Sequence, residues 1–362
     1  MVMQNKSKTI IAAMSGGVDS SVAAALYKEK GYNVIGVTLH MKDKDDEREE
    51  IKACCGPDEQ TRARMVCEKL GIEHHFVSAK EDFAEKVLRY TWSEYCIGRT
   101  PNPCVMCNHF IKFGPVMQQL CEKFGAEGII TGHYAVIDRS DPQKARLFKG
   151  ENKAKDQTYF LSALTQEQLN LCHMPLGDID KEQVRSIAEK LGLPTAKAKE
   201  SQDTCFGYKD EIFAETLARY FKQKAKPGNM LDDSGKIIGK HKGIQYYTIG
   251  QRKKLGVALG APAYVINIDA PQNQITISTD ADKLLTSEFY ADGMNWLDFD
   301  GDSMECEIMT RYRQPLQAAT VYKEGDKARV VLKEPLASVT PGQRLAVYKN
   351  GQHKPSKRRN PR

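Results

Sequence analysis

Residues 8–20 read K-T-I-I-A-A-M-S-G-G-V-D-S, an apolar run that leads directly into two glycines and an acidic turn. The run Lys8–Met14 predicts a buried strand, and the Ala-rich segment Ser20–Lys30, closed by Gly31, predicts a helix. Backbone N–H groups of the intervening loop Ser15–Ser20 can turn toward one anion at the positive end of that helix. We therefore predict a phosphate-binding loop, with a simple strand–helix turn as the alternative. No Gly-Lys-Ser/Thr follows, so the loop is not of the Walker A type.

The segments that follow keep alternating between strand-like and helix-like patterns. Strands of this length separated by helices imply βαβ units around a parallel sheet, so the N-terminal half is predicted to be a doubly wound α/β domain. The predicted strands are Asn33–His40, Glu73–Ala79 and Gly128–His133, and the predicted helices are Asp58–Leu70, Glu81–Tyr95, His109–Phe124, Gln166–Leu171 and Lys181–Leu191.

The pattern changes after about residue 200. Ala263–Asp269 and Gln274–Ser278 flank a Pro-Gln-Asn turn and predict a β-hairpin. Further short alternating runs predict a C-terminal β-barrel or sandwich. These runs are Glu305–Arg313, Ala318–Tyr322, Ala328–Leu332 and Leu345–Tyr348.

Composition excludes several classes of protein. Of the 362 residues 41% are hydrophobic and 28% charged, which argues against disorder and low complexity. No apolar run approaches the roughly 20 residues of a membrane helix, and the polar start Met1–Lys8 is unlike a signal peptide, so we expect a cytoplasmic protein and no membrane partner. The last nine residues contribute five of the six net positive charges, so bulk charge does not identify a nucleic-acid binder.

Ten cysteines in a chain of this kind favour catalytic, metal-binding or buried thiols over disulfides. Thr100–Asn108 reads T-P-N-P-C-V-M-C-N and precedes a predicted helix, whose N-terminus would lower the pKa of the Cys107 thiol. Cys205 lies in the polar stretch Glu200–Phe206. A zinc ribbon would need a second C-x-x-C, which is absent; a thioredoxin-like disulfide and ordinary buried thiols remain alternatives.

The loop Ser15–Ser20 resembles the signature of the pyrophosphatase-loop ATPases, which adenylate a substrate oxygen. Further motifs follow in one order and together resemble the tRNA-specific 2-thiouridylases over nearly the whole chain. These motifs are the T-P-N-P-x-x-x-C-N run, Thr131-Gly132-His133-Tyr134, Lys155-Asp156-Gln157, the loop with Cys205, and Pro341-Gly342-Gln343.

This resemblance implies ATP-dependent 2-thiolation of the wobble uridine, position 34, in tRNAs for Lys, Glu and Gln. Uracil O2 would be adenylated and then replaced by sulfur, with AMP and pyrophosphate released. ATP and Mg²⁺ would be required, and a sulfur-relay protein or cysteine desulfurase would supply the sulfur. The implied regions are the ATP-binding and catalytic domain over 1–200, a central linking domain over 201–280, a tRNA-contacting β-barrel over 281–350 and a basic tail over 351–362.

The resemblance also implies roles for individual residues. Cys107 would be the nucleophile and Cys205 the persulfide carrier. Residues implied to bind ATP are Ala13, Met14, Ser15, Gly16, Gly17, Val18, Asp19, Ser20, Leu39 and Gly132. Those implied to contact the target base are Asn102, Pro103 and Cys104, and those implied to contact the rest of the tRNA are His133, Lys155, Asp156, Gln157, Arg311, Tyr312 and Gln343. Each of the tRNA contacts has a structural alternative, such as a core histidine, a turn or a strand residue.

Cys104 departs from the family pattern, in which many members have Asp at this position. Cys104, Cys107 and Cys205 could instead hold a [4Fe–4S] cluster with one open iron, which would bind hydrosulfide. Both sulfur routes stay open, and the pair Cys54 and Cys55 has no physical explanation. The alternative functions are a different adenylating enzyme, such as an amidating synthetase, a non-catalytic RNA-binding protein, and an iron–sulfur or redox protein.

Overall fold

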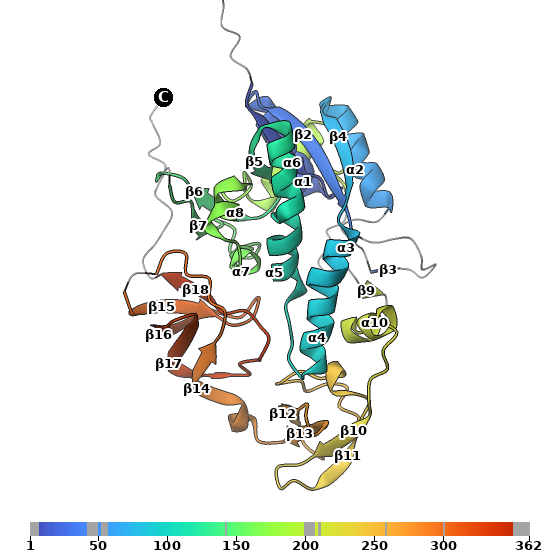
Figure 1. The fold of residues 1–362 in the computed structure, drawn as a ribbon, viewed down its shortest axis with the longest axis vertical. Helices are drawn as coiled ribbons and strands as arrows, with labels where there is room; N and C mark the ends of the chain where they lie inside the picture. The colour runs from blue at the N-terminus through green and yellow to red at the C-terminus, as the bar shows by residue number, and fades with distance from the viewer. Residues whose placement is uncertain are drawn as a thin grey trace, which may run out of the picture.

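The computed structural model describes residues 7–41, 50–51, 57–141, 143–198, 207–208, 211–257, 259–299 and 301–349. An α/β domain occupies one end of the molecule, and two smaller β-rich regions lie side by side at the other end (Figure 1). Cys54, Cys55, Cys205 and the basic tail predicted over 351–362 lie outside the described residues.

A five-stranded sheet forms the centre of the α/β domain. Its order is β4-β2-β1-β5-β8, and every neighbouring pair is parallel. The chain moves from β1 outward to β2 and β4 and then returns to the other side of β1, so the sheet reverses its order between β1 and β5. Ligands of open α/β sheets bind at the carboxyl ends of the strands at such a reversal. The strands are β1 (Thr9–Ala13), β2 (Asn33–His40), β4 (Glu73–Ser78), β5 (Ala126–Ile130) and β8 (Cys172–His173).

Helices cover both faces of this sheet, which confirms the doubly wound prediction. Alternate residues of β1 divide between two apolar cores: Ile10 and Ala12 face one, and Ile11 faces the other. The first core is closed by α1 (Val18–Glu29), α2 (Pro57–Leu70) and α9 (Lys181–Lys190). The second is closed mainly by the π-helical turns η1 (Phe83–Arg89) and η2 (Asn108–Lys112) with α4 (Tyr90–Cys96), α5 (Pro103–Cys107), α6 (Pro115–Phe124) and α8 (Gln166–Leu171).

The prediction of one continuous helix over His109–Phe124 is wrong. Helical structure begins earlier, at Pro103, stops after Lys112 and restarts at Pro115. Pro115 has no N–H to continue the previous helix but suits the first position of a new one. Gly114 fits the break because a Cβ there would lie 1.7 Å from the carbonyl oxygen of Phe110.

The rest of the α/β domain consists of short elements, including an antiparallel hairpin that the sequence analysis did not predict. Its strands, β6 and β7, pair Ala135 with Lys149 and Asp138 with Arg146. The bounds are α3 (Lys80–Asp82), β6 (Ala135–Asp138), β7 (Arg146–Lys149) and α7 (Thr158–Leu161), with β3 (Glu50–Ile51) paired to β9 (Gly207–Tyr208).

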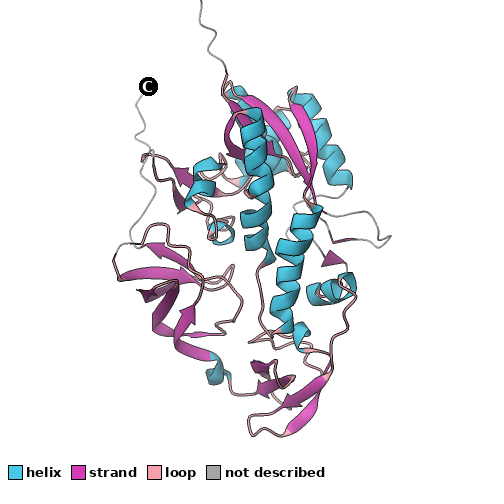
Figure 2. Cartoon of the chain, viewed as in Figure 1, coloured by secondary structure: helices cyan, strands magenta, loops and turns pink. Residues whose placement is uncertain are grey.

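Two further sheets with their own apolar cores follow (Figure 2), in agreement with the predicted change to β structure. The central sheet has the order β11-β10-β13-β12 and the C-terminal sheet the order β14-β17-β16-β15-β18. Their elements are α10 (Phe213–Tyr220), β10 (Gly228–Leu231), β11 (Ile237–His241), η3 (Ile244–Tyr246), β12 (Tyr264–Asp269), β13 (Gln274–Ser278), η4 (Ala281–Leu284), β14 (Leu285–Ala291), β15 (Ser303–Met309), β16 (Gln317–Glu324), β17 (Lys327–Ala337) and β18 (Ala346–Lys349). Among the described helices, none combines the length and apolar character needed to cross a membrane.

Candidate functional site

The loop Ser15–Ser20 lies at the carboxyl end of β1, beside the reversal of strand order, and opens the 12-residue helix α1. Ser20 closes the loop, because its Oγ accepts the Ser15 N–H at 3.3 Å and donates to the Gly17 carbonyl at 3.1 Å. Within the described chain, no side chain caps α1 at Gly17. The first N–H groups of the helix therefore point into the loop, as an anion site requires.

Close packing explains one glycine of the loop, Gly16, and one that lies against it, Gly132. Gly16 has φ +71°, and a Cβ there would lie 2.1 Å from the carbonyl oxygen of Glu59 in α2. Gly132 follows β5, and a Cβ there would lie 2.7 Å from atoms of Asp19 and Ser20. The loop thus packs against α2 at Gly16 and against the end of β5 at Gly132 so closely that only hydrogen fits at these two positions.

Asp19 forms an ionic and hydrogen-bonded cluster in the first turn of α1. The ammonium group of Lys181, at the start of α9, lies 2.7 Å from each carboxylate oxygen, and the Tyr134 hydroxyl donates to Oδ1 at 2.7 Å. The side chain of Lys181 is only 13% exposed. A nearly buried cation next to a phosphate loop can pair with a carboxylate or a phosphate, so this cluster suits a nucleotide site. The sequence analysis did not consider Lys181 for the site and gave no role to Tyr134, which it named only as part of a motif.

The other residues predicted to bind nucleotide line the same edge of the sheet. Ala13 ends β1, and the Met14 N–H donates to the Val37 carbonyl at 2.8 Å. Leu39, near the end of β2, is buried in the apolar core that also contains Cys107. The structure therefore brings Ala13–Ser20, Leu39 and Gly132 to the carboxyl ends of three adjacent strands.

The predicted target-base residues form the start of helix α5, not a loop. The Asn102 side chain accepts the Val105 N–H at 3.3 Å and caps the helix, and Pro103 occupies its first position. Cys104 and Cys107 are one helical turn apart and share a face. Cys107 is 6% exposed, whereas Cys104 is partly exposed.

One expectation for Cys107 is wrong. We predicted that it precedes a helix, but it lies in the middle of the helical segment Pro103–Lys112. Only Cys104 lies in the first turn, where the helix dipole favours a thiolate. Cys205, the predicted partner of Cys107, falls outside the described residues.

Several of the predicted RNA-contacting residues are engaged within the protein. His133 is 8% exposed, its Nδ1 lies 2.8 Å from the Thr131 hydroxyl, and burial lowers its pKa well below the usual range, so the ring is neutral. Asp156 accepts the Gly150 N–H at 3.0 Å, and burial raises its pKa. Gln157 exchanges two hydrogen bonds with the backbone of Tyr134, at 2.9 and 3.0 Å. Lys155 lies in the same turn and is partly exposed.

The remaining three are contributed by the C-terminal domain. Arg311 is exposed, and the ring of Tyr312 lies 4.2 Å from that of Phe160. Gln343 contacts the chain just before α5: its Nε2 lies 2.8 Å from the Thr100 carbonyl oxygen and 3.3 Å from that of Pro101. The predicted RNA-contacting residues therefore reach from the α/β domain to the C-terminal domain.

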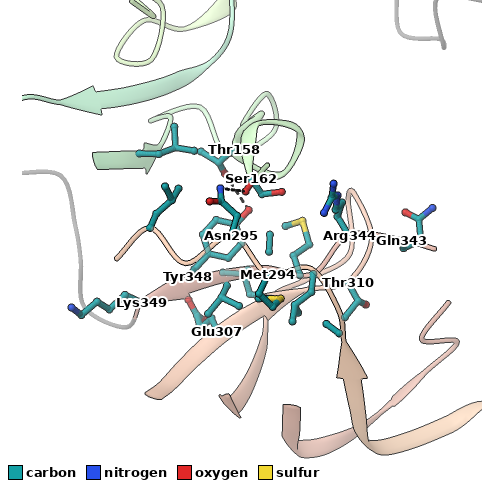
Figure 3. A pocket seen from close by; sticks show the side chains of 18 of the residues that line it. Thr158, Ser162, Met294, Asn295, Glu307, Thr310, Gln343, Arg344, Tyr348 and Lys349 are labelled. Atoms are coloured by element: carbon teal, nitrogen blue, oxygen red, sulfur yellow. Dashed lines mark hydrogen bonds between the residues drawn. The ribbon is translucent and has the colours of Figure 1, made fainter. Parts of the chain in front are cut away.

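A cleft of about 1750 Å³ separates these two domains. Figure 3 shows Asn295 of the C-terminal domain turned toward Ser162, and its amide also donates to the Leu164 carbonyl at 2.7 Å. Lys144 of the α/β domain bridges the cleft to Asp298 at 2.8 Å. The volume exceeds the roughly 300–1,000 Å³ of typical small-molecule sites. The cleft reaches α5, the helix that contains Cys104 and Cys107, at Met106, but its lining does not include the phosphate loop.

Three sequence models of known domains match the chain in succession. They describe a tRNA methyl transferase HUP domain over residues 8–209, a tRNA methyl transferase PRC-barrel domain over 214–279 and an aminomethyltransferase β-barrel domain over 286–352. The α/β class with a central domain and a C-terminal barrel is thereby confirmed.

Full-length relatives are more specific. The chain is 42% identical to the tRNA-specific 2-thiouridylase MnmA of Carboxydothermus hydrogenoformans, and the match covers 94% of each chain. It is 43% identical to MnmA 2 of Clostridium botulinum and 41% identical to MnmA of Acetivibrio thermocellus, in each case over 94% of this chain and 96% of the relative. Identity of this extent over nearly the full length of both chains places this protein in the family of tRNA-specific 2-thiouridylases.

Proposed function

We propose that this chain catalyses ATP-dependent 2-thiolation of the wobble uridine, position 34, of tRNA. The observation that carries the proposal is the combination, in one α/β domain, of a phosphate loop at the strand ends with two cysteines on one face of a capped helix. A methyl transferase, as the domain names read, would need neither feature. An amidating synthetase would use the loop but not the cysteines.

The loop Ser15–Ser20 fits the triphosphate of ATP. Backbone N–H groups at the start of α1 would hold the pyrophosphate portion. Asp19 offers the oxygen ligands that Mg²⁺ prefers. A Mg²⁺ ion bound there would neutralise phosphate charge. Lys181 would then pair with a phosphate oxygen in place of Asp19 and neutralise a further part of that charge.

Adenylation makes the substrate reactive. The C2 carbonyl of uracil is part of a urea-like group and is a poor electrophile, so direct attack by sulfur is slow. Transfer of AMP from ATP to O2 releases pyrophosphate and turns O2 into a leaving group. The protein must hold the base and the α-phosphate in line. The family resemblance gives the contacts with the base to Asn102, Pro103 and Cys104.

Sulfur transfer then uses two thiols. The terminal sulfur of a Cys205 persulfide would attack C2, form a C–S bond and expel AMP. The Cys107 thiolate would attack Sγ of Cys205, break the S–S bond to the substrate and leave 2-thiouridine with a Cys107–Cys205 disulfide. Two electrons from an external thiol reductant would restore both thiols, and a sulfur-relay protein or cysteine desulfurase would reload Cys205.

Cys104 supports the other sulfur route, in which hydrosulfide is delivered from an iron–sulfur cluster. Together with Cys107 and Cys205 it would supply three thiolates to a [4Fe–4S] cluster, which when bound offers an open iron for hydrosulfide. Cys104 and Cys107 fit this assignment because one helical turn brings both side chains to the same face. Iron and acid-labile sulfide in protein purified without oxygen separate the two routes: about four iron atoms per chain, lost in Cys104→Ala, would favour the cluster.

The tRNA partner would span both domains. Arg311, Tyr312 and Gln343 on one side, and Lys155, Asp156, Gln157 and His133 on the other, are the proposed contacts with the anticodon stem-loops of tRNAs for Lys, Glu and Gln. Exposed Arg311 suits a phosphate, and the Tyr312 ring suits stacking on an unpaired base.

The experiment that tests the proposal measures pyrophosphate and AMP formed from ATP with and without tRNA transcripts that contain U34. Adenylation of the nucleotide would be supported if pyrophosphate and AMP are released only with tRNA and if Asp19→Asn abolishes this release. Lys190→Met at the exposed end of α9 is the control variant. Release independent of tRNA would contradict the proposed substrate.

A further inference from the structure

Thr100 is held by all three domains. It follows helix α4 of the α/β domain and lies two residues before Asn102, which caps α5. Its N–H donates to the Pro341 carbonyl of the C-terminal domain at 2.8 Å, and its carbonyl accepts from Gln343 Nε2 at 2.8 Å. Its hydroxyl lies 3.1 Å from that of Thr248 in the central domain.

The loop 341–343 fits closely against this point. A Cβ on Gly342 would lie 2.8 Å from the Thr100 nitrogen and 3.0 Å from Arg99 Cβ, and Gly342 has φ +92°. A glycine is therefore required there for both space and backbone conformation. The neighbouring Arg344 continues the contact, since its Nη2 lies 3.3 Å from Met106 Sδ within α5.

Gln343 uses both ends of its amide in this contact. Its NH₂ group faces two carbonyl oxygens, those of Thr100 and Pro101 at 2.8 and 3.3 Å, and its Oε1 lies 3.3 Å from the Tyr159 hydroxyl. An amide has two donor hydrogens, so both are engaged by the segment that leads into the cysteine helix. A residue that only formed a surface turn would not need these three hydrogen-bond partners for its side chain.

We propose that Gln343 is a positioning residue, through which the C-terminal domain fixes the start of α5 and with it the orientation of Cys104 and Cys107. The roles of the two thiols rest on the proposed function. The hydrogen bonds from Gln343 to Thr100 and Pro101, however, are present in the protein without RNA. The hydrogen bonds of the Gln343 side chain, next to the backbone bond from Thr100 to Pro341, then link docking of the C-terminal domain to the geometry of α5. The same amide can contact RNA only through its remaining acceptor site unless it releases the backbone.

The test is amide hydrogen exchange of the peptide that contains Thr100–Asn108, in full-length protein without tRNA or ATP. Gln343→Glu keeps the size of the side chain but turns a carboxylate oxygen toward two carbonyls; Gln343→Met removes the hydrogen bonds without adding charge. Gln317→Glu makes the same chemical change in the same domain and serves as the control, because among the described residues its amide hydrogen-bonds to the nearby Pro315 carbonyl alone.

We expect exchange of this peptide to rise about tenfold in Gln343→Glu and to rise in Gln343→Met, with no change in Gln317→Glu. We also expect Gln343→Met to lower kcat for thiolation about tenfold while KM for tRNA changes less than twofold. Unchanged exchange, together with a raised KM and normal kcat, would overturn the proposal and leave Gln343 as an RNA contact only. If Gln343→Glu does not fold, Gln343→Met alone decides, and failure of the enzyme to thiolate tRNA would leave the exchange result valid.

Discussion

The ammonium group of Lys181 lies 2.7 Å from both carboxylate oxygens of Asp19, a residue 162 positions earlier in the chain. The pair joins the first turn of α9 to the first turn of α1, where the phosphate loop ends. Because α1 has no side-chain cap at this end, an arriving triphosphate would meet the positive end of its dipole and a cation already in place.

Replacement of Lys181 by Met should weaken ATP binding by roughly 10- to 150-fold, because one charge-assisted hydrogen bond of about 1.5–3 kcal/mol is lost and Asp19 is left to repel the phosphates. Titration calorimetry at fixed Mg²⁺ measures the dissociation constant directly. Lys190→Met on the same helix is the matched control. An ATP dissociation constant equal to that of the unaltered protein would exclude Lys181 from the nucleotide site.

Gly16→Ala should lower the free energy of unfolding by about 1–3 kcal/mol more than Gly31→Ala, the range expected for overpacking. Both glycines have positive φ, +71° and +85°, but only Gly16 has a backbone atom within the space of a Cβ, whereas Gly31 has nothing within 4 Å. Urea unfolding of the two variants measures the difference. An equal decrease in the free energy of unfolding for the two variants would mean that α2 moves away at Glu59 and that the close contact does not affect stability.

His173 should make the protein less stable below about pH 6.5. Burial lowers its pKa from 6.5 to about 4, while its Nδ1 lies 2.8 Å from the Tyr27 hydroxyl. The unfolded chain therefore binds a proton between these two values that the folded chain does not, so stability is present above pH 6.5 and is lost as the pH falls toward 4. The loss is about 1 kcal/mol between pH 6 and 5, from 1.4 kcal/mol for each pKa unit.

His173→Gln keeps a partner for Tyr27 but does not titrate. Urea unfolding at pH 8, 6 and 5 should give a shallower pH dependence for this variant than for the unaltered protein, with pH 8 as the reference for lost packing. Parallel curves for the two proteins would show that the ring of His173 titrates normally in the folded state.

The local elements were predictable because their signals are local. Strand β2 has the predicted bounds Asn33–His40, since Gly31 ends the preceding helix and an acidic stretch follows the apolar run. The hairpin of β6 and β7 was missed although Ala-Val-Ile-Asp and Arg-Leu-Phe-Lys flank the sequence Ser-Asp-Pro, which is typical of turns. The Gly114-Pro115 pair was also a readable stop signal.

The contacts that assemble the site could not be read in the same way. Gln343 binds the carbonyl of Thr100 across 243 residues, and no pattern in either segment specifies the other. Lys181 looked like an ordinary first-turn residue of a surface helix until the fold placed it next to Asp19. Motif order led to the prediction of the site residues, whereas their mutual contacts depend on how three domains dock.

The most direct test of the proposed function is the formation of 2-thiouridine at position 34 by the purified protein, with ATP, Mg²⁺, a persulfide donor and a U34 tRNA transcript. Mass spectrometry of the digested tRNA identifies the base, and AMP is measured in the same samples. We predict one AMP for each 2-thiouridine formed, and no 2-thiouridine with Cys107→Ser while tRNA affinity is retained. AMP release without sulfur in the tRNA of the unaltered protein, or full thiolation by Cys107→Ser, would contradict the account.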